Sequence, residues 1–204
     1  DPEPDNDSDS ETTWPVNVII ANDDNAGPVN GYTGANAVVN VFGNDLLNGL
    51  PVNPLQLILT ETVPNPSGYL SLNPDGTVDV NPGTPAGSHS LTYQICETAN
   101  PTNCDDAIVT ITVEAAQIIA NDDSGSANGY TGATNVLNVF TNDLLNGNPV
   151  NPAEVILTET VTDPTGTLTL NADGSIDVAA GTPAGSYSLT YQICEVLNPT
   201  NCDD

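Results

Sequence analysis

The chain contains the same domain-sized sequence twice. The segment Gly31–Ala35 (GYTGA) recurs as Gly129–Ala133, and roughly 55 of the 76 paired positions from there to the end are identical without a gap. Upstream, Ala21–Asp24 matches Ala120–Asp123, with one residue more in the first copy. The period of about 98 residues is the size of one β-sandwich domain. We therefore expect two successive domains of one fold, with a boundary near Glu114–Ala120.

Alternating apolar and polar residues predict short β-strands within each copy. The longest, Ser186–Cys194, places four apolar side chains at alternate positions. The other predicted strands of the second copy are Thr134–Phe140, Glu154–Val161, Thr167–Leu170 and Ser175–Val178, after a leading strand near Gln117–Ala120. The first copy adds a last strand, Ala107–Val113, which has no counterpart before Asp204. These patterns predict an all-β fold of two tandem immunoglobulin-like seven-stranded β-sandwiches, the second lacking its last strand.

The first twenty residues differ from both copies. Residues 1–11 have no apolar side chain and many carboxylates, which predicts an acidic, flexible tail. Residues 12–20 alternate like a strand. The sandwich repeats then cover residues 21–116 and, incompletely, 117–204.

The N-terminal strand and the unfinished second sandwich suggest a mode of assembly. An exposed sheet edge accepts a strand from another chain. We expect the segment 12–20 to be a donor strand that completes the second domain of another copy and so builds a filament. The alternative is that later residues of a longer repeat protein supply this strand. The expected assembly residues are Trp14, Val16, Val18 and Ile20.

The chain has no lysine or arginine, 27 acidic residues and one histidine, so its formal charge is −27 at neutral pH. No ordinary salt bridge can form. Nucleic acids and anionic membranes are excluded as partners because both are bound through basic side chains. Crowded carboxylates destabilise a compact state unless counter-ions compensate them, and hard oxygen ligands favour calcium.

The predicted strand directions bring acidic turn residues together at one pole of each domain, where they could bind calcium. The expected ligands are Asp23, Asp24, Asn44, Asp45 and Asp105 in the first copy and Asp122, Asp123, Asn142, Asp143 and Asp203 in the second, with Glu114 contributing from across the junction. The alternative is that Asn and Asp are present only because they favour turns.

Each copy carries a cysteine pair, Cys96 with Cys104 and Cys194 with Cys202, at the connection between two consecutive strands. Antiparallel neighbours at this spacing suit a disulfide. A metal–thiolate site is the alternative, but it lacks a CxxC spacing and a partner histidine. Two disulfides would indicate a protein outside the cytosol.

The sequence offers little for catalysis. His89 is the only imidazole, and Tyr187 occupies its position in the second copy, so both are expected to be packed or surface strand residues. We therefore expect no enzyme, although a carboxylate pair of glycosidase type remains an alternative. Trp14 and the tyrosines could instead form a small glycan-binding face, or they could pack in the core or at the junction.

Several motifs together resemble a known family. They are Ala21–Asp24 (ANDD), Val38–Asp45 (VVNVFGND), Gly68–Gly76 (GYLSLNPDG) and Pro85–Cys96 (PAGSHSLTYQIC). This combination resembles the cadherin-like and immunoglobulin-like tandem repeats of large bacterial surface adhesins, which include calcium-binding stalk repeats and gliding-motility adhesins. The paired cysteines are not a general feature of such repeats.

The resemblance implies a secreted, extended, calcium-stiffened fibre at the cell surface that serves attachment. The alternatives to this interpretation are a carbohydrate-binding module and an accessory domain of a secreted enzyme. It assigns calcium to Asp23 and Asp24 with Asn44 and Asp45, and to Asp122 and Asp123 with Asn142 and Asp143.

Overall fold

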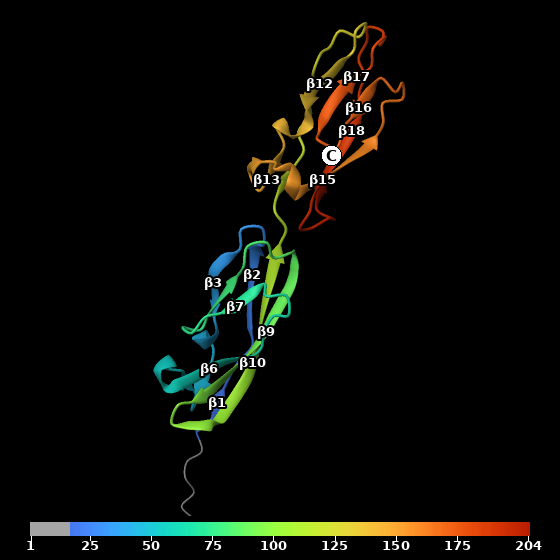
Figure 1. Ribbon diagram of the computed structural model, residues 1–204. Coiled ribbons are helices and arrows are strands. Elements are labelled where there is room, and N and C mark those ends of the chain that lie inside the picture. The colour runs from blue at the N-terminus through green and yellow to red at the C-terminus, as the bar shows by residue number, and fades with distance from the viewer. Residues whose placement is uncertain (1–16) are drawn as a thin grey trace, which may run out of the picture.

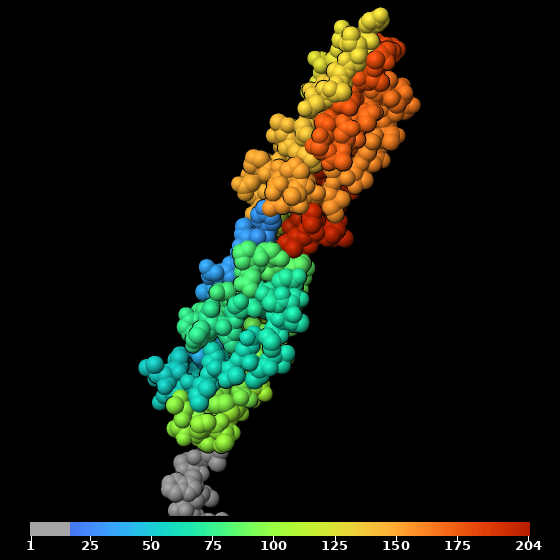
Figure 2. All heavy atoms as spheres, in the orientation of Figure 1, coloured from blue at the N-terminus to red at the C-terminus, as the bar shows by residue number. Residues whose placement is uncertain are grey.

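The computed structural model describes residues 17–204, which form two β-sandwich domains arranged end to end (Figure 1). Figure 2 shows an elongated molecule in which the second domain continues the long axis of the first. The chain leaves the first domain through β10 (Asn100–Glu114) and enters the second through β11 (Ile118–Ile119). Only residues 115–117 separate the two strands. The predicted all-β fold of tandem sandwiches is confirmed.

The first domain consists of three sheets. Their strand orders are β1-β4-β5, β2-β10-β9-β6 and β3-β8-β7. The strands besides β10 are β1 (Ile19–Ile20), β2 (Asp24–Asn30), β3 (Ala35–Asn40), β4 (Leu46–Leu47), β5 (Leu50–Pro51), β6 (Leu57–Val63), β7 (Leu70–Leu72), β8 (Thr77–Val80) and β9 (Gly87–Glu97). Two short 3₁₀ helices, η1 (Val41–Gly43) and η2 (Pro54–Gln56), follow β3 and β5.

The core of the first domain comes from the period-2 alternation of its long strands. In β10, Val109 and Ile111 are fully buried. Ile108, which points to the opposite face of the strand, is 45% exposed. The neighbouring β9 turns Leu91, Tyr93 and Ile95 to the same core. Because β10 pairs antiparallel with β9 and parallel with β2, it closes the four-stranded sheet over that core.

The second domain repeats this plan with fewer strands. Its sheets have the orders β11-β13-β14, β12-β17-β16 and β15-β18-β19. The strands after β11 are β12 (Ala133–Asn138), β13 (Leu144–Leu145), β14 (Asn148–Pro149), β15 (Val155–Val161), β16 (Leu168–Leu170), β17 (Ser175–Val178), β18 (Thr190–Glu195) and β19 (Cys202–Asp203), with 3₁₀ helices η3 (Val139–Thr141) and η4 (Pro152–Glu154). As predicted, no strand in residues 117–204 corresponds to Ala107–Val113 of β10.

Two details of the strand prediction need correction. The first domain has ten strands, not seven, because the turns after η1 form the short β4–β5 hairpin and because residues 24–30 form β2. In the second domain the predicted strand Ser186–Cys194 forms only from Thr190 onward. Its first half has no partner there, whereas the equivalent part of β9 pairs with β10.

Each domain is closed at one end by a disulfide. Both predicted disulfides, Cys96–Cys104 and Cys194–Cys202, are formed, and residues 17–204 hold no free cysteine. Each disulfide joins the two arms of a hairpin, β9 to β10 and β18 to β19. Within the described part of the chain, no helix has the length and apolar character needed to cross a membrane.

The first prediction concerns the disulfides. Replacing Cys96 and Cys104 by serine should lower the free energy of unfolding by about 2–3 kcal/mol, because the short closed loop no longer restricts the unfolded chain. Denaturant unfolding of the oxidised protein and the double variant measures the change. An unaltered midpoint, or about four thiols reacting with Ellman's reagent in the denatured, non-reduced protein, would contradict the disulfide assignment.

Candidate functional site

A buried tyrosine organises two of the predicted acidic residues in the first domain. The Tyr93 hydroxyl lies 3.0 Å and 3.2 Å from the two carboxylate oxygens of Asp45, and 3.1 Å from the carbonyl oxygen of Asn22. Asp45 also accepts a 2.8 Å hydrogen bond from the Asn22 amide. Asp24 is 5% exposed, and its Oδ2 has no hydrogen-bond partner. We call Tyr93, Asp24 and Asp45 the Tyr93 cluster.

The second domain has the same arrangement, the Tyr191 cluster of Tyr191, Asp123 and Asp143. The Tyr191 hydroxyl lies 3.1 Å from Asp123 Oδ2 and 3.1 Å from Asp143 Oδ1. The Asn121 amide donates to Asp143 at 2.8 Å. Asp143 is buried and Asp123 is half-buried. Since the chain has no lysine or arginine, hydroxyl and amide groups supply the donors that such carboxylates require.

The other predicted ligands surround these clusters but make separate contacts. Asp105 accepts from the Ala21 amide and Asp203 from the Ala120 amide, both at 2.9 Å. Asn44 and Asn142 donate their side-chain amides to the carbonyl oxygens of Asp23 and Asp122, respectively. The carbonyl oxygen of Glu114 accepts from the Gly31 amide, and its side chain is exposed. Most of the predicted residues therefore link segments within one domain.

Burial raises the pKa of the clustered carboxyls. The pKa of Asp24 rises to about 6, mainly because of burial, with further increases from the nearby charges of Asp45 and Asp23. Burial likewise raises the pKa of Asp45, Asp123 and Asp143. The pKa of Tyr93 is also raised, so this hydroxyl keeps its proton and remains a donor.

The clusters meet only part of what calcium requires. Their carboxylate and carbonyl oxygens have the hard donor chemistry that calcium prefers, and Asp24 Oδ2 is free. Calcium takes six to eight oxygen ligands, however. Most carboxylate oxygens here already accept protein hydrogen bonds, and in residues 17–204 no three acidic, histidine or cysteine side chains are grouped to hold a metal ion.

The junction between the domains uses residues that the sequence analysis did not select. The Tyr32 hydroxyl donates to Glu154 at 3.1 Å, the Asn30 side chain donates to Asn146 at 2.8 Å, and the Ala86 amide donates to Asn198 at 2.7 Å. Tyr32 also packs against the core of the second domain. These three links connect residues at one end of the first domain directly to residues at the adjoining end of the second.

At the end where the chain enters each domain, one buried carboxylate differs between the copies. Glu97 in the first domain accepts hydrogen bonds from the side-chain amides of Asn17 and Asn103. Its counterpart Glu195 is 1% exposed, and its Oε1 has no partner. Ala116 replaces Asn17 in the second copy, so the donor to this oxygen is missing.

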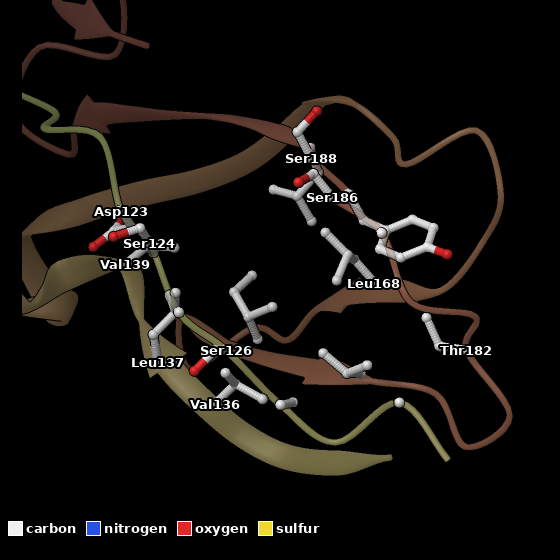
Figure 3. A pocket seen from close by; sticks show the side chains of 18 of the residues that line it. Asp123, Ser124, Ser126, Val136, Leu137, Val139, Leu168, Thr182, Ser186 and Ser188 are labelled. Carbon is white, nitrogen blue, oxygen red and sulfur yellow. The ribbon is translucent and has the colours of Figure 1, made fainter. Parts of the chain in front are cut away.

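The second domain contains a groove with a volume of about 1070 Å³. Figure 3 shows Ser124 and Ser126 along one wall and Ser186 and Ser188 along the opposite wall, with Leu168 between them. Apolar side chains of Val136, Leu137, Val139 and Ile176 line the interior. Sequence analysis predicted the missing strand but did not identify the residues that line the space.

The remaining predicted positions are the assembly residues and the equivalent pair His89 and Tyr187. Trp14 and Val16 lie outside the described residues. Val18 is exposed, and Ile20 belongs to β1, which pairs with β4 of its own domain. His89 Nε2 lies 2.8 Å from the carbonyl oxygen of Pro85, and the Tyr187 hydroxyl donates to Pro183 at 2.9 Å. The two equivalent positions therefore make the same kind of local contact.

Searches for similar proteins find solved structures at low sequence identity only. No protein-family model matches this chain, and neither does any curated protein. Among solved structures, Drosophila N-cadherin EC1-3 is similar over 91% of this chain and 62% of that one, at 12% identity and a TM-score of 0.48. Human protocadherin-24 EC1-2 is similar over 88% of this chain and 86% of that one, at 13% identity and a TM-score of 0.32.

A third similar structure is an endo-fucoidan hydrolase of glycoside hydrolase family 107. It matches 92% of this chain and 27% of its own length, at 15% identity and a TM-score of 0.37. This chain thus spans less than two thirds of the N-cadherin fragment and about a quarter of the hydrolase. At such identities and TM-scores the likeness carries no conclusion about function.

The second prediction concerns the raised pKa of Asp24. The folded state holds this proton more tightly than the unfolded chain, whose ordinary value is 3.8. The resulting stabilisation is complete below about pH 4 and is lost as the pH rises through about 6. In EGTA, Asp24→Asn should therefore melt higher than the parent protein at pH 7, and the difference should disappear near pH 4.

Asp75→Asn provides a control of opposite sign. Hydrogen bonds from Thr77 lower the pKa of Asp75, so this variant should melt lower than the parent protein at pH 7. If Asp24→Asn destabilises the protein equally at pH 4 and pH 7, the buried charge does not oppose folding.

Proposed function

We propose that this chain is a structural, non-enzymatic module of an extracellular adhesin stalk or filament of the bacterial cell-surface type. The observation that carries the proposal is the direct succession of two sandwiches with closely similar sequences. Only residues 115–117 separate β10 from β11. A chain of this kind extends in one direction as repeats are added, because each domain contacts only its neighbours.

The junction contacts support a mechanical role. A linker without such contacts would let the domains move freely. Here Tyr32 reaches Glu154 and Asn198 accepts from Ala86, so side chains on both sides of the connection resist bending. Their hydrogen bonds supplement the packing of Tyr32 against the second core.

The disulfides support the extracellular assignment. Such bonds persist in oxidising compartments and are rare in the cytosol. Each one lies across the hairpin at the end of its domain where the chain enters, and it fixes two strands together. We propose that both disulfides stiffen the module against unfolding.

Calcium is the proposed counter-ion of this module. A charge of −27 without one lysine or arginine leaves solvent cations as the only compensation. Asp24 and Asp45, and in the second domain Asp123 and Asp143, are the residues that would hold calcium, since each pair lies around a tyrosine hydroxyl, with Asp24, Asp45 and Asp143 buried and Asp123 half-buried. Its role would be to offset the repulsion between these carboxylates.

We further propose that modules join by strand donation at the unfinished sheet of the second domain. The partners are then other copies of this chain or neighbouring repeats of a longer chain. A head-to-tail contact of this kind does not close on itself, so it produces a filament. Electron microscopy of native material tests this assembly, because discrete particles would argue against it.

The third prediction tests calcium. Calcium that binds only the folded protein adds about 2.7 kcal/mol of stability at a hundredfold excess over its Kd. The melting temperature should therefore rise from EGTA to calcium at matched ionic strength, and the rise should shrink in Asp24→Asn. Asp75→Asn, outside both clusters, serves as the control and should keep the full rise.

Two outcomes would overturn parts of this proposal. Identical melting curves with calcium and with EGTA would remove calcium but leave the structural role intact. Specific binding to a polysaccharide array would instead indicate a carbohydrate-binding module, because a stalk repeat should not bind glycans.

A further inference from the structure

We propose that the groove of the second domain receives an extended β-strand with the chemistry of β10, uncharged and aliphatic at alternate positions. The inference deepens the strand-donation step of the proposed function and rests on it. Its starting point is the first domain, which has nearly the same sequence and holds β10 in the equivalent place. The first domain therefore serves as a template for the occupied groove.

Burial of matching side chains identifies the missing element. Leu91 in the first domain is 2% exposed, whereas its counterpart Leu189 is only half-buried. The same change separates Leu70 from Leu168. These residues are identical in type between the copies, so the difference comes from their surroundings. In the first domain the side chains of β10 complete those surroundings.

The backbone on both walls of the groove is unused. In the first domain, β2 and the first half of β9 both pair with β10. In the second domain the equivalent residues 123–128 and 183–189 form no strand, and no backbone–backbone hydrogen bond joins them to another part of residues 17–204. Two facing edges with free amide and carbonyl groups are suited to strand addition.

The template also defines the register of the incoming strand. In the first domain Val109 lies between Asp24 and Leu91, and Ile111 lies between Ala26 and His89. In the second domain, Asp123 and Leu189 flank the position equivalent to Val109. Gly125 and Tyr187 flank the position equivalent to Ile111. The pairing irregularity between Ile111 and Val113 falls where the first copy has one extra residue, so pairing in the second domain should be regular.

A carboxylate sets the position of the strand's first residues. The amide of Ile108 donates to Asp23 Oδ1 at 2.9 Å. Asp122 is the counterpart of Asp23, and its exposed carboxylate stands beside the groove wall. It can accept from the amide at the equivalent position of an incoming strand. Asp204, the counterpart of Asp106 in β10, also lines the groove.

The spacing of residues disfavours the N-terminal segment of a second copy as the occupant. Four residues lie between Val113 and Ile118 at the junction, and four lie between Trp14 and Ile19. With β1 retained in its own domain, this spacing places Trp14 at the level of Val113. Ser10 then falls at the fully buried position of Val109, and the acidic residues Glu11 and Asp9 flank it. An uncharged aliphatic strand fits better.

The fourth prediction tests the occupant with a synthetic peptide of sequence Asp105–Glu114 (DDAIVTITVE). Added to the full 204-residue chain, it should bind with one-to-one stoichiometry by calorimetry. Hydrogen exchange should slow at residues 123–128 and 185–189, because their amides gain partners. No binding, or slowed exchange elsewhere only, would overturn the proposal.

Two sets of controls follow from the register. Peptides carrying Val109→Asp or Ile111→Asp should bind at least about tenfold more weakly, since a charge would enter the apolar groove. A peptide carrying Thr112→Asp, on the exposed side of the strand, should bind more nearly like the parent peptide.

The second set of controls changes the protein. Asp122→Ala should weaken peptide binding. Asp23→Ala, the same change in the first copy, should not. Equal effects of both changes would contradict the role of Asp122.

The test also separates the other occupants. A chain extended after Asp204 by a copy of Ala107–Glu114 should melt higher and lose peptide binding, because the groove is then filled. Tighter binding of a peptide with the sequence of residues 7–18 would overturn the proposal in favour of the N-terminus of a second copy. Either failure would leave the stalk function open to its own tests with calcium and electron microscopy.

Discussion

Hydrogen bonds from tyrosine hydroxyls and backbone amides to buried carboxylates replace the ion pairs that this chain cannot form. Asp45 and Asp143 are almost completely buried, and each accepts from one tyrosine and one backbone amide. A buried carboxylate without a cation is costly unless such donors are present. The same bonds hold β4 and β13, and the segments before them, against the long strands. The fold therefore depends on Tyr93 and Tyr191.

The compensation by these donors is incomplete. Asp24 Oδ2 and Glu195 Oε1 are buried without partners. Each such oxygen opposes folding while it is charged. An acidic protein with unpaired buried carboxylates gains from any cation that reaches them, and this is the physical link between the composition and the proposed use of calcium.

The presence of β10 in the first domain only explains why the two domains differ in the completeness of their cores and sheets. With β10 in place, the first domain has one tightly packed core and a complete four-stranded sheet. Without its counterpart, the second domain keeps its hairpins and its disulfide but leaves an apolar groove between two free edges. Residues 17–114 and 117–204 are thus built on one sequence pattern but differ in the completeness of their sheets.

The sequence alone determined the tandem architecture, the disulfides and most strands. The hairpin strand Ser175–Val178 has the predicted bounds, because period-2 alternation and turn residues act locally. Tertiary structure decided the rest. The segment before Leu91 forms a strand while the nearly identical segment before Leu189 does not, since a strand needs a partner. Likewise, the carboxylates gather around tyrosines about fifty residues away in sequence, a contact that only the packing of distant strands creates.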